Sequence, residues 1–259
     1  MTQKLYCFKI GGSVITNKAI AYTAKKKTIK AIAQSLREIK SPIVISHGVG
    51  SFAHPSAAKY IRKNGYTSRW GLAKVARDAQ EINRIFIDAF IEVGLPVISF
   101  SPRSSLLTEK AETDTFFFDP ILEALHQGLI PVIHGDGIFD TKQKIAIYSG
   151  ETSLNLLVRY LLKHDFTIEK IIQLCNVDGV LDENNKAIPE ITQSNWETVK
   201  RYIKKMEVID FSGGMKHKVE EALLMTKYGI ETVIINGNKV DSLTNFIKGK
   251  QLKGTIIRK

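Results

Sequence analysis

The sequence predicts an α/β protein, a three-layer αβα sandwich with a mostly parallel central sheet. Two observations carry this prediction. Short β-branched apolar runs alternate along the chain with longer segments of helical period, and such alternation is typical of strand–helix–strand units in a parallel sheet. The predicted strands are also apolar on both faces, which indicates a sheet covered by helices on each side.

The strands and helices follow in order from these runs. Seven strands are predicted, at residues 5–10, 42–46, 95–100, 129–135, 170–175, 231–237 and 254–259. Helices are predicted at residues 25–40, 71–93, 118–127, 151–164, 195–205, 213–229 and 240–248. The turn-like DTKQ ahead of KIAIYSG (144–150) indicates a hairpin with the end of the preceding strand region.

No repeat, low-complexity tract or Pro/Gly-rich linker interrupts the chain. We therefore predict a single domain over residues 1–259. Within it we expect two closely joined lobes, residues 1–167 and 168–259, divided near 165–170.

Composition narrows the class of protein. The 259 residues are 44% hydrophobic and carry a formal charge of +11, which fits a globular enzyme but leaves nucleic acid, a membrane surface and an anionic substrate open as partners. Apart from the cluster at 25–27 the lysines are scattered and are not interleaved with stacking aromatics, so solvated helix faces are favoured over a nucleic-acid site. No stretch approaches the roughly 18 apolar residues of a membrane span.

Cysteine usage and the N-terminus indicate a cytoplasmic protein. Cys7 and Cys175 both lie in predicted buried strands, so no disulfide framework and no Cys/His metal motif is expected. The sequence MTQKLYCFKI has no long apolar core of a signal peptide.

Glycine-rich loops follow most of the predicted strands. GGS follows the first strand, HGVGS the second, HGDG the fourth, NVDG the fifth and NGN the sixth. Ligands of open α/β sheets bind beyond the carboxyl ends of the strands, and glycine lets backbone N–H groups approach an anion there. A positive-φ turn explains any single loop equally well, but the repetition favours a long anionic ligand or two phosphates that meet. GxxxxGK[ST] and a βαβ GxGxxG motif are both absent.

Several segments resemble the amino acid kinase superfamily, in this order and across nearly the whole length. They are KIGGSVITNK (9–18), HGVGSFAHP (47–55), HGDGIFD (134–140), YSGETSLNLL (148–157), NVDGVL (176–181) and DFSGGMKHKVEEAL (210–223). Within the superfamily the chain is most similar to the isopentenyl phosphate kinases, mainly through the loop that contains His54. The resemblance implies the amino acid kinase fold, with an acceptor-binding lobe at 1–167 and an ATP-binding lobe at 168–259. It also implies a homodimer.

The implied reaction is ATP-dependent phosphorylation of isopentenyl phosphate to isopentenyl diphosphate by direct in-line transfer. Such a reaction needs alignment, positive charge and N–H donors. By resemblance, Lys9 bridges the transferring group, Lys18 assists it and Lys218 lies near the ATP phosphates, although an exposed lysine is the plain alternative for Lys218. The predicted catalytic residues are these three lysines and His54. The predicted ATP-binding residues are Lys9, Gly11, Gly12, Ser13, Asp178, Gly179, Gly213, Gly214 and Lys218.

The acceptor is expected at the loop after the second strand. The resemblance implies that His54 hydrogen-bonds a phosphate or phosphonate already present on the acceptor. The predicted substrate-binding residues are Gly48, Gly50, Ser51, His54, Gly150, Glu151, Trp70, Val75 and Ile82. The last three are candidates for contact with a prenyl tail, and core packing explains their helical spacing just as well. No protein metal site is predicted, because Mg²⁺ would arrive with ATP.

Three departures from the family pattern affect this interpretation. SGE at 149–151 replaces the usual Ser-Gly-Asp, Ala53 replaces a glycine before the histidine, and Val49 separates Gly48 from Gly50. Asp178 is either an adenosine-side residue or a turn former with Gly179. The alternative functions are a kinase of another small phosphate or phosphonate, similar to the fosfomycin kinases, and a non-catalytic nucleotide-binding regulator.

Overall fold

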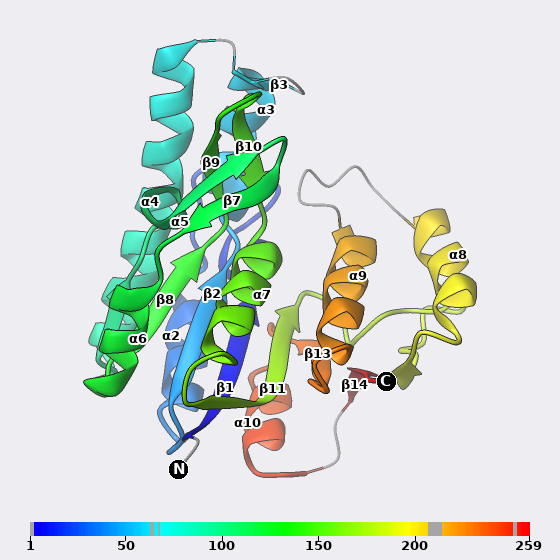
Figure 1. Ribbon diagram of the computed structural model, residues 1–259. Helices are drawn as coiled ribbons and strands as arrows, with labels where there is room; N and C mark the ends of the chain where they lie inside the picture. The colour runs from blue at the N-terminus through cyan, green and yellow to red at the C-terminus, as the bar shows by residue number, and fades with distance from the viewer. Residues whose placement is uncertain (1–2, 63–64, 67, 207–213, 251–252) are drawn as a thin grey trace.

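The computed structural model is a three-layer α/β/α protein with one large sheet between two layers of helices (Figure 1). It describes residues 3–62, 65–66, 68–206, 214–250 and 253–259. The fold class predicted from the sequence is confirmed, and its mostly parallel sheet places the carboxyl ends of the central strands along one edge.

The large sheet has eight strands in the order β12-β14-β13-β11-β1-β2-β8-β5. All neighbouring pairs are parallel except β13 with β14. The strands are β1 (Gln3–Ile10), β2 (Ile43–His47), β5 (Val97–Ser99), β8 (Ile130–His134), β11 (Phe166–Cys175), β12 (Glu190–Ile191), β13 (Thr232–Asn236) and β14 (Gly254–Ile257). The predicted strand regions are all confirmed.

Helices cover both faces of this sheet and bury separate apolar clusters. One cluster joins the sheet to α2 (Lys26–Leu36), α4 (Arg69–Ile91) and α10 (Val240–Ile247). On the other face α6 (Asp119–His126) and α7 (Gly150–Leu161) form a second cluster with the sheet. A third cluster gathers α8 (Trp196–Met206), α9 (Gly214–Thr226) and the strands of the C-terminal half.

A smaller region of strands, paired antiparallel except for β6 with β9, extends beyond the carboxyl ends of the large sheet (Figure 1). It contains the sheet β10-β9-β6-β7 and the hairpin β3-β4. Its strands are β3 (Ile61–Arg62), β4 (Gly65–Tyr66), β6 (Leu106–Glu109), β7 (Glu112–Phe116), β9 (Asp136–Asp140) and β10 (Lys144–Tyr148). The predicted hairpin at 144–150 is confirmed by the antiparallel pairing of β10 with β9.

The main difference from the sequence prediction lies after β2. The segment expected to be a loop ending at His54 is a helix, α3 (Gly50–Tyr60), and two short helices, α1 (Gly12–Ile15) and α5 (Pro102–Ser105), were also not predicted. Gly, Ser and Pro55 give α3 few helix-forming residues. Packing against α4 holds it in place.

The predicted division between residues 167 and 168 falls inside β11, which pairs with β1 on one side and β13 on the other. The two halves therefore share one continuous sheet. None of the helices within the described residues is long and apolar enough to cross a bilayer.

Candidate active site

A cavity of about 870 Å³ opens at the carboxyl ends of β1, β2 and β11. Its polar lining comes from the loops and helices that start there. Its two apolar groups come from different parts of the chain: Ala57, Val75, Ile145 and Ile147 from the N-terminal half, and Val177, Leu181, Ile203 and Met215 from the C-terminal half. A ligand with a charged middle and two less polar ends fits such a lining.

Two glycine-rich loops are in backbone contact at the centre of the cavity. A Cβ added at Gly12 would lie 2.6 Å from the backbone N of Gly50, and one added at Gly48 would lie 2.6 Å from the N of Gly12. Gly50 has a φ of +47°, and a Cβ there would lie 2.1 Å from Thr16 Oγ1. Only glycine permits this approach, so the loops after β1 and β2 lie directly against each other. The N–H groups of Gly11 and Gly48 donate to the carbonyls of Leu174 and Ile10 at 2.8 and 2.9 Å.

Two lysines share one carboxylate at the floor of the cavity. Glu151 lies in the first turn of α7, and its Oε1 is 2.5 Å from both Lys9 Nζ and Lys218 Nζ. Lys9 is the second-to-last residue of β1, and Lys218 lies on α9. The Glu151 side chain is only 2% exposed. Three elements distant in sequence therefore meet at one buried carboxylate with a net positive surrounding.

The electrostatics of this triad follow from burial and charge. Burial tends to raise the pKa of Glu151, but the charges of Lys218 and Lys9 outweigh it and hold the pKa well below its usual range. Burial lowers the pKa of Lys9 to about 8, against the attraction of Glu151 and with the repulsion of Lys218. Burial also opposes charge on Lys218, yet Glu151 raises its pKa above the ordinary value. The carboxylate is ionised and orients two cations.

Comparison with known proteins places this geometry in a family. The amino acid kinase family model matches residues 4–236. The chain belongs to the amino acid kinase family. Isopentenyl phosphate kinase of Methanocaldococcus jannaschii is 30% identical, over 98% of this chain and 98% of its own length. The isopentenyl phosphate kinase of Thermoplasma acidophilum is 31% identical, over 96% of this chain and 98% of its own length.

A solved structure described as an X-ray structure of isopentenyl phosphate kinase agrees in fold. It superposes with a TM-score of 0.81 at 25% identity, covering 98% of this chain and all of that one. The resemblance to the isopentenyl phosphate kinases that the sequence motifs indicated is confirmed.

Most of the residues that the amino acid kinase resemblance singled out line the cavity. They are Lys9, Gly11, Gly12, Ser13, Lys18, Gly48, Gly50, His54, Val75, Gly150, Glu151, Gly179, Gly214 and Lys218. The substitution of Glu151 for the usual aspartate keeps the carboxylate in contact with both lysines. Ala53 and Val49 also line the cavity.

Four predicted contact residues do not line the cavity: Ser51, Trp70, Ile82 and Asp178. Ser51 is buried, and its backbone N–H donates to Thr16 Oγ1 at 3.0 Å, so this N–H does not face the cavity. Trp70 is 63% exposed and stacks edge-on with Tyr60. Ile82 is fully buried in the apolar cluster of α2 and α4.

These placements correct two of the three predicted tail contacts, since core packing accounts for Ile82 and surface exposure for Trp70, whereas Val75 lines the cavity. Asp178 accepts hydrogen bonds from Asn236 Nδ2 and Lys239 Nζ, both at 2.7 Å, and does not line the cavity. Gly213 lies outside the described residues.

Two other histidines are structural. His47 and His134 end β2 and β8, are fully buried, and stack with ring centroids 5.6 Å apart. Burial and the neighbouring His134 lower the pKa of His47 to about 4. His47 Nε2 is 3.1 Å from Asn83 Oδ1. His54 and His217 line the cavity, whereas His47 and His134 do not.

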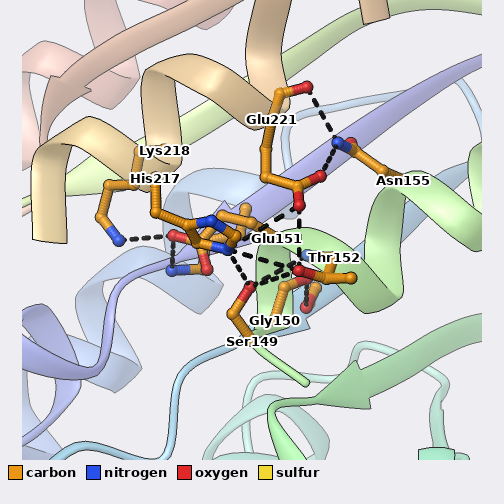
Figure 2. A network of polar contacts seen from close by, with 10 residues as sticks. Ser149, Gly150, Glu151, Thr152, Asn155, His217, Lys218 and Glu221 are labelled. Carbon is orange, nitrogen blue, oxygen red and sulfur yellow. Dashed lines mark hydrogen bonds and ion pairs between the residues drawn. The ribbon is translucent and has the colours of Figure 1, made fainter. Parts of the chain in front are cut away.

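Sequence reasoning missed a polar network between α7 and α9 (Figure 2). Its members are Ser149, Thr152, Asn155, His217 and Glu221. Ser149 caps α7 by accepting from the Thr152 N–H, and the Ser-x-x-Thr spacing was a signal for that cap. Nothing in the sequence indicated its partners on α9, because those contacts span more than 60 residues.

Proposed function

We propose that this protein transfers the γ-phosphoryl group of ATP to isopentenyl phosphate and forms isopentenyl diphosphate and ADP. The observation that carries the proposal is the placement of the Lys9–Glu151–Lys218 triad beside the touching glycine loops. Phosphoryl transfer concentrates negative charge on the moving group, and lysines with backbone amides are the groups that stabilise it. Relatives named isopentenyl phosphate kinase match over nearly the full length and support the same reaction.

The lining supports a division of the cavity between the two substrates. Residues 168–259 supply the apolar group around Val177 and Met215 together with Gly179 and Lys218. We assign this side to ATP. Residues 1–167 supply His54 and the apolar group around Val75 and Ile145, and we assign this side to the acceptor, whose prenyl tail would lie among the apolar side chains.

His54 supports an acceptor that already carries a phosphate. It lies in the second turn of α3, on the cavity wall, close in sequence to Gly48 and Gly50. An imidazole N–H donates well to a phosphate oxygen, and a protonated imidazole adds charge attraction. The acceptor oxygen is itself the nucleophile, so no covalent protein intermediate and no strong base is needed.

Within the transfer each side chain has a simple part. Lys9 and Lys218 neutralise charge on the moving group, with Lys18 on the same cavity wall. Glu151 fixes the positions of the first two through contacts of 2.5 Å. The side-by-side glycine loops let the two phosphates approach each other for in-line attack.

ATP brings Mg²⁺ to such sites. The described residues contain no group of three or more His, Cys, Asp or Glu side chains placed to hold a metal ion. This lining fits an ion held mainly by the ATP phosphates, with few protein ligands. Bound there, Mg²⁺ supplies further charge neutralisation.

An acceptor panel tests the proposal. ADP release is measured with Mg-ATP and isopentenyl phosphate, beside dimethylallyl phosphate, fosfomycin and an acceptor-free reaction. We expect efficient turnover with the prenyl phosphates alone. Turnover with fosfomycin alone would assign a related phosphonate kinase, and ATP binding without turnover on any acceptor would contradict an enzymatic function.

We further propose a cytoplasmic homodimer, as the family resemblance implies. Two free, buried cysteines fit a reducing compartment. Light scattering of the purified chain at several concentrations tests the dimer, and a monomer mass throughout would contradict it.

A further inference from the structure

The polar network between α7 and α9 has a geometry that suits more than helix packing. His217 and Glu221 are four residues apart on α9, and Thr152 and Asn155 are three apart on α7, so each pair lies on one helix face. Figure 2 shows these side chains pointing toward one another beside Glu151 and Lys218. The contacts form a ladder that begins at the cavity wall and runs away from it.

The distances define the ladder. His217 Nε2 lies 2.9 Å from Ser149 Oγ and 3.3 Å from Thr152 Oγ1. Thr152 Oγ1 donates to Glu221 Oε1 at 3.0 Å, and Asn155 Nδ2 donates to Glu221 Oε2 at 2.6 Å. Asn155 Nδ2 also donates to the Glu221 carbonyl at 2.9 Å. We call these five residues the α7–α9 seam.

The donor and acceptor capacity of each group indicates which atom carries each proton in the seam. An ionised Glu221 only accepts, so Thr152 gives its single hydroxyl proton to that carboxylate. The contact between Thr152 Oγ1 and His217 then requires His217 Nε2 to carry a proton and donate. The Glu221 side chain is 13% exposed and Asn155 is 7% exposed, so each loses most of its water and depends on the seam partners.

Apolar packing and the seam hold different sides of α9, and the apolar side includes Met215 in the first turn. Val219, Ala222 and Leu223 of α9 belong to the apolar cluster of the C-terminal half. Met225, near the other end of the helix, packs in the cluster that contains α7. The end of α9 that carries Lys218 contacts α7 through the seam and through the ion pair of Lys218 with Glu151.

We propose that the seam positions Lys218 for phosphoryl transfer, with Glu221 as its central residue. The inference rests on the proposed kinase function. Glu221 and Asn155 do not line the cavity and act through Lys218. Since a displacement of about 1 Å costs up to 10²-fold in rate, a loosened seam should lower kcat more than it changes either KM.

The decisive variant is Glu221→Gln, which keeps the shape and removes the charge. We expect kcat with Mg-ATP and isopentenyl phosphate to fall about tenfold, with both KM values within about twofold. The matched control is Glu220→Gln, because Glu220 is the next residue of α9 and faces Lys200 and Lys216 instead. It should retain the parent kcat.

A double-mutant cycle separates positioning from general damage. In a Lys218→Met background the Glu221→Gln change should alter kcat by less than about twofold, because the residue that it positions is gone. An equal loss in both backgrounds would overturn the proposal. If Glu221→Gln fails to fold, Thr152→Val replaces it, with Thr152→Ser as the variant that should restore the rate.

A second readout needs no turnover. Lysine acylation of the folded protein, followed residue by residue by mass spectrometry, should modify Lys218 at least about fivefold faster in Glu221→Gln and Thr152→Val, because opening of the seam exposes it. The rate in Glu220→Gln should match the parent. Unchanged labelling of Lys218 in both seam variants would overturn the proposal. A parent without kinase activity would contradict the proposed function, and the labelling comparison would still decide the seam.

Discussion

The loops after β1 and β2 border the same cavity as helices α7 and α9, but different forces hold the two regions. The loops are fixed by backbone contact, with Gly12 and Gly48 too close to each other and to Gly50 for any side chain. The helices are fixed by charge and hydrogen bonds around Glu151 and Glu221. Backbone packing allows no adjustment, whereas a charged contact tolerates a change of side-chain length, as the glutamate at position 151 illustrates.

The charged region should show the largest effect. Lys218→Met removes one of the two cations on Glu151 and should lower kcat about 10³-fold, the scale of a lost charge at a transferring phosphoryl group. Steady-state kinetics measure this. The matched control is Lys216→Met on the same helix, where Lys216 pairs with Glu220. Near-parent turnover of Lys218→Met would remove that lysine from the mechanism.

In the glycine loops, an added side chain should lower activity through steric crowding. A Cβ at Gly12 meets the N and Cα of Gly50 at 2.6 and 2.8 Å, so Gly12→Ala must part the two loops. We expect kcat/KM to fall about 10²-fold, because the phosphates lose their alignment. Gly94→Ala is the control, since that site has a φ of +81° but open space around it. Equal kinetic losses in the two variants would refute the crowding explanation.

Replacement of His54, which lies near the glycine loops, should lower the rate less than Lys218→Met or Gly12→Ala. His54→Ala removes one hydrogen bond to a charged group, so kcat/KM for the acceptor should fall about 10- to 100-fold. The Kd of ATP, measured by calorimetry, should stay within about twofold of the parent value. His126→Ala changes an exposed histidine beside Glu123 and serves as control. An unchanged acceptor kcat/KM in His54→Ala would sink the acceptor-site assignment.

The smallest effect concerns pH. With the pKa of Lys9 lowered to about 8, this lysine is charged below pH 8 and loses its charge above it. Since the pH dependence of kcat/KM reports groups of the free enzyme, kcat/KM should decrease progressively above pH 8. In Glu151→Gln the attraction that raises the pKa of Lys9 is absent, so the decline should begin at lower pH. If kcat/KM declines at the same pH in the parent and in Glu151→Gln, the electrostatic coupling of Lys9 to Glu151 is contradicted.

The sequence predicted the two regions unequally. The alternation of apolar runs was enough for the sheet and its helices, because strand and helix periods are local properties. The glycine motifs located the backbone region, although the helix α3 was hidden by its Gly, Ser and Pro55 residues. Motif resemblance located Lys9, Glu151 and Lys218, which the structure brings together.

The parts that sequence reasoning missed depend on contacts between distant segments. The spacing that suggested a tail contact for Ile82 is the spacing of a core residue, and a single helix gives no sign of which buried face borders a cavity. Likewise Asn155 and Glu221 lie 66 residues apart. Their pairing follows from the packing of α7 beside α9, which no local pattern encodes.

The most direct test of the kinase assignment is ³¹P NMR of a reaction containing the purified protein, Mg-ATP and isopentenyl phosphate. We expect the monophosphate signal to be replaced by the two coupled signals of a diphosphate monoester, with one ADP formed for each acceptor consumed. A monophosphate signal that persists while ATP remains intact would contradict the assignment.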